Sequence, residues 1–86
     1  MKFQGAVIKE QGLTFAIVIV KKQILSSKSE SNNTQEAFSI YFPGLPIVLM
    51  AQDSRGVPTY YGRNDIVKFL ANILISQISW KEYTFR

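Results

Sequence analysis

The sequence predicts an α+β fold, in which two β-β-α units are followed by a C-terminal strand. Segments rich in β-branched and aromatic residues occur in pairs separated by short polar turns, which is typical of hairpins. Each pair is followed by a segment whose apolar or aromatic residues have helical spacing. Because hairpin strands pair antiparallel, we expect a mainly antiparallel sheet with the helices packed on one face. The length suits a single domain, residues 1–86.

The first predicted hairpin joins residues 3–9 to residues 13–22 through a turn at Glu10, Gln11 and Gly12. In its second strand, the side chains on one face are Leu13, Phe15, Ile17 and Ile19, and those on the other are Ala16, Val18 and Val20. Both faces are therefore apolar. We expect a central strand covered on two sides, or a strand whose second face meets a partner.

Residues 26–34 contain only polar and charged side chains, and we interpret them as a mobile loop. Asn33 or Thr34 is a suitable N-cap for a helix, and Glu36 stands three residues after Asn33 in the capping-box arrangement. The helix that follows would carry three aromatic residues at positions i, i+3 and i+4, namely Phe38, Tyr41 and Phe42.

The second predicted hairpin joins residues 46–51 to residues 57–61 through a turn at 52–56. Pro58 lacks an N–H donor, so we expect the returning strand to lie at a sheet edge or to be interrupted there. A helix is predicted over 64–74 from four apolar residues at helical spacing. A last strand, including Trp80, is predicted within 78–85.

Residues 45–74 resemble the strand-strand-helix end of the thioredoxin fold. The resemblance rests on Leu45 and Pro46, the apolar run to Met50, the turn ending at Gly56, and the strand and helix that follow. In that family a cis-proline precedes the first of these strands. The family's paired redox cysteines are absent here, so the resemblance does not imply redox activity.

Two missing residue types exclude most catalytic and metal chemistry. The chain has no cysteine and no histidine, so it lacks a thiol nucleophile, an imidazole base and the commonest zinc ligands. We therefore expect no enzyme activity, no cofactor and no metal. The longest apolar run, 15–20, is too short to cross a bilayer, and the N-terminal residues do not resemble a secretory signal. We expect a cytoplasmic protein without a membrane partner.

The candidate ligand or partner patch comprises polar and aromatic residues of the second hairpin and the start of the second helix: Gln52, Asp53, Arg55, Tyr60, Tyr61 and Arg63. Tyrosine and arginine are enriched at interface hot spots, and arginine binds carboxylate or phosphate groups. Arg63, beside a helix N-terminus, is the candidate anion-binding residue. The alternative is an ordinary polar turn, an edge strand and a capped helix, in which Arg63 only pairs with Asp65.

A second candidate site is a pair of carboxylates. Glu10 and Asp53 each lie in or beside a hairpin turn, and equivalent turns would meet at one end of a sheet. Two neighbouring carboxylates can act as general acid and base if their pKa values are driven apart. The alternative, that both are solvated turn residues, agrees with the general exposure of acidic side chains.

These observations favour a small non-enzymatic binding or assembly module that self-associates into a homodimer, because the two-faced apolar strand needs cover. A monomer in sedimentation equilibrium would contradict this. The alternative is a nucleic-acid-binding domain with a basic and aromatic sheet surface, since the net charge is +4. Its residues would be Lys9, Lys21, Lys22, Arg55 and Arg63 with Phe3, Phe15, Tyr60 and Tyr61. The expected partner is thus a second copy, an acidic protein or a nucleic acid.

Overall fold

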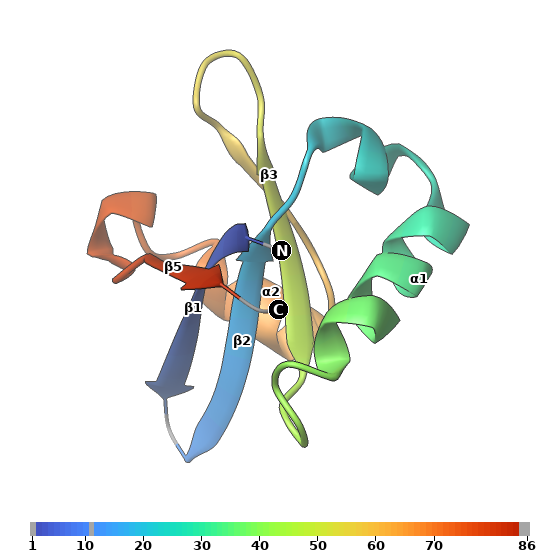
Figure 1. The fold of residues 1–86 in the computed structure, drawn as a ribbon. Helices are drawn as coiled ribbons and strands as arrows, with labels where there is room; N and C mark the ends of the chain where they lie inside the picture. Colours follow the sequence, from blue (N-terminus) through green and yellow to red (C-terminus); the bar gives the residue numbers. More distant parts are fainter. Residues whose placement is uncertain (1, 11, 85–86) are drawn as a thin grey trace.

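A computed structural model describes residues 2–10 and 12–84 of the chain. Within these residues one sheet contains five strands in the order β4-β3-β2-β1-β5 (Figure 1). The strands are β1 (Lys2–Glu10), β2 (Leu13–Ile19), β3 (Ile47–Gln52), β4 (Pro58–Tyr61) and β5 (Lys81–Thr84). The helices are α1 (Lys28–Ser39) and α2 (Asn64–Leu70), with short 3-10 helices η1 (Lys22–Ser26) and η2 (Ile75–Gln77). None of these four helices has the length and apolar character needed to span a membrane.

The sheet is mixed and mostly antiparallel, and the predicted α+β fold is confirmed. β1 pairs antiparallel with β2 and β5, and β3 pairs antiparallel with β4. The exception is the β2–β3 pair, which is parallel and places Ala16 opposite Ile47 and Ile19 opposite Met50. Parallel neighbours need a crossover connection, and η1 with α1 supplies it. The two predicted β-β-α units are therefore joined through parallel central strands.

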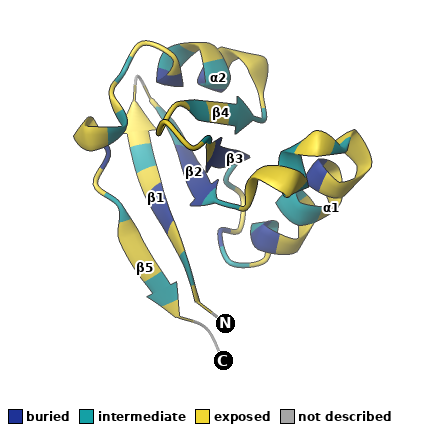
Figure 2. Ribbon diagram, turned by 90° about the horizontal axis from the view of Figure 1, so that it is seen from above, coloured by how far each residue is buried: buried dark blue, intermediate teal, exposed yellow. Residues whose placement is uncertain are grey.

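The two helices cover opposite faces of the sheet, and the prediction that both pack on one face is wrong (Figure 2). α2 buries Ile66 and Leu70 against one face of the central strands, together with Phe15 and Ile17 of β2. α1 contributes Phe38 to a second cluster on the other face, which includes Ala16 and Val18 of β2. The physical reason is that β2 is apolar on both faces, and each face needs its own apolar cover. The chain supplies both covers itself.

The predicted loop over 26–34 is wrong from Lys28 onward, because α1 begins there. Ser27, not Asn33 or Thr34, is the N-cap, and its hydroxyl accepts a hydrogen bond from the Glu30 N–H at 3.3 Å. The helix buries only Ser31 and Phe38 and is otherwise held by polar contacts. The Ser31 hydroxyl lies 2.9 Å from the Ile24 carbonyl oxygen, and the Gln35 side chain donates to the Ile47 carbonyl at 2.7 Å.

The C-terminal part of the chain differs from prediction in its boundaries. α2 ends at Leu70 instead of residue 74, and β5 begins at Lys81, so Trp80 precedes the strand. Phe85, the predicted end of the strand, lies outside the described residues. The hairpin and helix of the thioredoxin-like segment are present, but no described peptide bond is cis, so the peptide bond before Pro46 is trans.

The second hairpin is confirmed, and β4 is an edge strand as Pro58 predicted. Its turn is closed by two backbone hydrogen bonds of 3.0 Å, from Gly56 N–H to the Asp53 carbonyl and from Asp53 N–H to the Val57 carbonyl. Gly56 adopts a φ of 82°, a left-handed conformation that glycine reaches without steric cost. The hairpin projects at the top of the molecule in Figure 1, beside η1.

Candidate functional site

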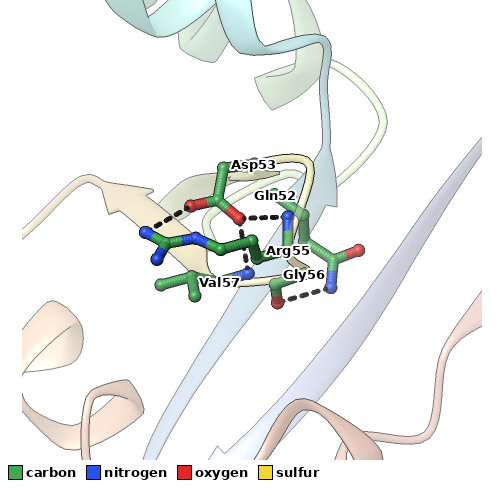
Figure 3. Close-up of polar contacts among 5 residues, drawn as sticks. All are labelled: Gln52, Asp53, Arg55, Gly56 and Val57. Carbon is green, nitrogen blue, oxygen red and sulfur yellow. Dashed lines mark hydrogen bonds and ion pairs between the residues drawn. The ribbon is translucent and has the colours of Figure 1, made fainter.

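The residues of the predicted patch do not lie together, and the first group of them forms the β3–β4 turn (Figure 3). One carboxylate oxygen of Asp53 accepts hydrogen bonds from the N–H groups of Arg55 at 2.8 Å and Val57 at 2.9 Å. The Arg55 guanidinium lies 3.8 Å from the other oxygen, and Gln52 donates to the Gly56 carbonyl at 3.1 Å. The two backbone bonds, from Val57 and then Arg55, lower the pKa of Asp53. Asp53 thus stabilises the turn as an anion.

The two tyrosines lie on opposite faces of the sheet, because adjacent strand residues point to opposite sides. Tyr61 packs against the α1-side cluster, and its hydroxyl donates to the Asn32 side-chain oxygen at 2.6 Å. Tyr60 packs against the α2-side cluster, and its enclosed hydroxyl has no hydrogen-bond partner. The two rings therefore cannot form one recognition surface.

Arg63 lies at the far end of β4 from the turn and pairs with Asp65. Its guanidinium donates two hydrogen bonds to the Asp65 carboxylate, at 2.8 Å and 2.6 Å. Because both side chains are exposed, the pair adds little to stability, which agrees with the alternative considered for Arg63 in the sequence. The Asp65 carboxylate in the first turn of α2 already engages this guanidinium, and anion binding by Arg63 stays a prediction. The strand β4 lies between Arg63 and Arg55 and holds them at its two ends.

The Arg63–Asp65 pair makes a prediction for pH titration. The hydrogen bonds from Arg63 lower the pKa of Asp65 to about 2, from an ordinary value of 3.8. We expect Arg63→Gln to raise that pKa toward 3.8, as measured by NMR titration of the carboxyl carbon. Since the folded-state pKa is depressed, the pair's stabilisation is present above about pH 4 and is lost as the pH falls through about 2. An unchanged Asp65 titration in the variant would contradict the pairing.

Glu10 and Asp53 do not form an acid–base pair, which corrects the second candidate site. Glu10 lies opposite Leu13 at the start of β2, and Asp53 follows β3 beyond Met50, which lies opposite Ile19. At ~3.3 Å per residue these ends of the sheet are at least about 20 Å apart. Figure 1 shows the two hairpins at opposite ends of the molecule. The reason is the parallel β2–β3 pairing, which sends the second hairpin in the opposite direction to the first.

A cavity of about 470 Å³ lies at the upper end of the sheet, between η1 and the second hairpin. Its lining includes Gln52 and Asp53 of the predicted patch and Lys22, which was named for the nucleic-acid alternative. The other lining residues belong to neither prediction: Gln23, Leu25, Ser26, Ala51 and Thr59. It stands at the carboxyl ends of the parallel strands β2 and β3, where open α/β sheets commonly bind ligands. This volume is suitable for a small ligand.

The cavity lining carries one cationic and one anionic side chain, Lys22 and Asp53. Lys22 acts on Asp53 only as a more distant charge that helps to lower its pKa, after the backbone bonds from Val57 and Arg55. The Asp53 carboxylate already accepts two backbone hydrogen bonds and lies near the Arg55 guanidinium. No ion pair among the described residues engages Lys22. Its exposed ammonium group therefore remains available at the cavity rim.

Across residues 2–10 and 12–84, no cluster of three or more acidic side chains is placed to hold a metal ion. No protein-family model, curated protein or solved structure matches the chain. The sequence signal for the cavity was the Lys21–Lys22 pair directly after an apolar strand.

Proposed function

We propose that the protein is a non-enzymatic binding module whose ligand has an apolar body and an anionic group. The cavity between η1 and the β3–β4 hairpin carries this proposal. Leu25 and the buried Ala51 provide apolar surface for the ligand body, and Lys22 provides the cation. The side-chain amides of Gln23 and Gln52 lie at the same cavity and can donate hydrogen bonds to the ligand's anionic oxygens.

The separation of Glu10 from Asp53 supports a binding role over an enzymatic one, because it removes the acid–base pair that the sequence suggested. The lowered pKa of Asp53 also supports a binding role over an enzymatic one. A carboxylate that is held ionised by two backbone N–H groups is a poor proton donor near neutral pH. Asp53 contributes to the site by fixing the hairpin that forms one wall of the cavity.

The two partner hypotheses from the sequence receive no new support. Self-association was inferred from the two apolar faces of β2, and α1 and α2 cover those faces within one chain. Nucleic-acid binding required an open sheet surface, yet Phe15 is buried beneath α2 and the two tyrosines point to opposite faces. Both hypotheses, and the cytoplasmic location, stay predictions.

A matched pair of small probes tests the proposal. We expect 4-phenylbutyrate, an anion with an apolar body, to shift the amide NMR signals of Gln23, Gln52 and Asp53. The cationic analogue 4-phenylbutylamine should bind more weakly at the same signals. We expect Lys22→Gln to weaken binding of 4-phenylbutyrate about two- to fivefold, the effect of one exposed charge pair. Sodium chloride at high concentration should have a similar effect by screening.

Lys9→Gln is the control, because it removes the same charge from the exposed end of β1, far from the cavity. It should leave the affinity for 4-phenylbutyrate unchanged. If 4-phenylbutyrate gives no shifts at the cavity, or if the two variants weaken binding equally, the proposed site is wrong. Equal affinity for the anionic and the cationic probe would contradict the assignment of an anionic ligand.

A further inference from the structure

The hydroxyl of Tyr60 is an unexplained feature of the described chain. The oxygen is enclosed by protein and has no hydrogen-bond partner, although the ring is only half-buried. Burial also raises the pKa of this phenol. Buried hydroxyl groups in proteins are nearly always hydrogen-bonded, because a hydroxyl that loses water without gaining a partner destabilises the fold. A bound ligand with a hydrogen-bond acceptor would supply the partner that this hydroxyl lacks.

Tyr60 also lines a groove of about 570 Å³ on the α2 side of the hairpin. The groove runs between the start of β4 and the segment that follows α2, and its lining includes Val57, Pro58, Leu70, Ile73 and Leu74. Val57 is 51% exposed and Leu74 is 68% exposed, which is high for large apolar side chains. Both residues face solvent at the groove. An apolar ligand in the groove would cover both.

We infer that this groove binds an uncharged, apolar ligand that carries one hydrogen-bond acceptor, and that the acceptor pairs with the Tyr60 hydroxyl. The lining residues contain no charged side chain, so a charged ligand would lose its hydration without gaining a partner. The polar side chains among them are the hydroxyls of Tyr60 and Ser76. One acceptor, such as a ketone or ester carbonyl, satisfies Tyr60.

The enclosed position of the hydroxyl sets a condition for binding. Leu74 follows α2 and is largely exposed, so few contacts hold its side chain in place. The inferred binding therefore requires side chains of this segment to move aside before the ligand reaches the hydroxyl. The inferred site is independent of the anion cavity proposed above, because the two lie on opposite sides of β4. Thr59 lines the cavity and the next residue, Tyr60, lines the groove.

The test uses two probes of nearly equal shape, acetophenone and α-methylstyrene. In α-methylstyrene a CH₂ group replaces the carbonyl oxygen of acetophenone, so the hydrogen-bond acceptor is lost. We expect acetophenone to shift the methyl NMR signals of Val57, Leu70 and Leu74 in the wild-type protein, and α-methylstyrene to bind more weakly. We expect Tyr60→Phe to weaken acetophenone binding about three- to tenfold, the usual effect of one hydrogen bond. The variant's affinity for α-methylstyrene should stay the same. Because the removed hydroxyl has no partner, the melting temperature of Tyr60→Phe should equal or exceed that of the wild-type protein.

Tyr61→Phe is the matched control on the adjacent position of β4. It removes a hydroxyl that donates to Asn32 at 2.6 Å on the other face, so it should lower the melting temperature and leave acetophenone binding unchanged. Equal binding of the two probes to the wild-type protein would overturn the inference, and this comparison needs no variant. An equal loss of acetophenone affinity in both variants would also overturn it, as would the absence of shifts at the groove.

Discussion

Replacing Gly5 with alanine is expected to lower the free energy of unfolding by about 1–3 kcal/mol, the usual cost of forcing an extra carbon into a packed interior. A Cβ atom at Gly5 would lie 2.6 Å from the Ile17 carbonyl oxygen, closer than Cβ atoms approach other atoms. The obstacle is backbone of the buried strand β2, so it cannot move aside as a side chain would. Gly5 also lies opposite both Val18 of β2 and Lys81 of β5. A displacement there disturbs both pairings of β1.

Urea denaturation followed by circular dichroism measures this change. Gln4→Ala is the control, because Gln4 is the exposed neighbour of Gly5 in the same strand and its truncation should change stability by less than about 0.5 kcal/mol. Gly5→Val should be worse than Gly5→Ala, since its side chain is larger at the same point. If Gly5→Ala is as stable as the wild type, the close approach of β1 to β2 described here is wrong.

Ile66→Ala is expected to cost about 2–5 kcal/mol, the range for truncating a fully buried Ile or Leu. Ile66 is 1% exposed and packs with Phe15, Ile17, Val48 and Met50 on the α2 face. α2 has only seven residues, too few to be stable as an isolated helix, so its packing on the sheet must stabilise it. Losing that contact should therefore affect the whole fold.

The control is Lys68→Ala on the same helix. Lys68 is exposed, and alanine has high helix propensity, so its free energy of unfolding should stay within about 0.5 kcal/mol of the wild type. Both variants are compared by urea denaturation. A loss below about 1 kcal/mol for Ile66→Ala would show that α2 does not form the second apolar cover of β2.

Sequence patterns predicted the strands better than the helices. The alternation in β2 identified a strand that is apolar on both faces, and Pro58 correctly placed β4 at an edge. α1 was placed too late because its first half has no apolar periodicity. It is held instead by hydrogen bonds from Ser31 and Gln35 to backbone carbonyls outside the helix. The one local signal was Ser27 followed by Glu30, a capping pattern that also occurs at Asn33 and Glu36.

For the candidate site, the sequence correctly predicted that the residues of the β3–β4 turn lie together. Gln52, Asp53 and Arg55 do lie together, because they belong to one turn whose geometry is local. Tyr60, Tyr61 and Arg63 do not join them, since strand alternation and strand length separate them. Gln23 and Leu25 were not predicted, and Lys22 was named only for the nucleic-acid alternative. Their approach to the hairpin depends on the parallel pairing of β2 with β3.

The sequence by itself determined the chemistry that is absent and the local elements: no thiol or imidazole, two hairpins, and an apolar strand that must be buried on both sides. Only the tertiary structure decided how these elements combine. Whether β3 runs parallel or antiparallel to β2 depends on the path of the connection between them, a choice that involves residues distant in sequence. That choice separates Glu10 from Asp53 and forms the cavity beside η1.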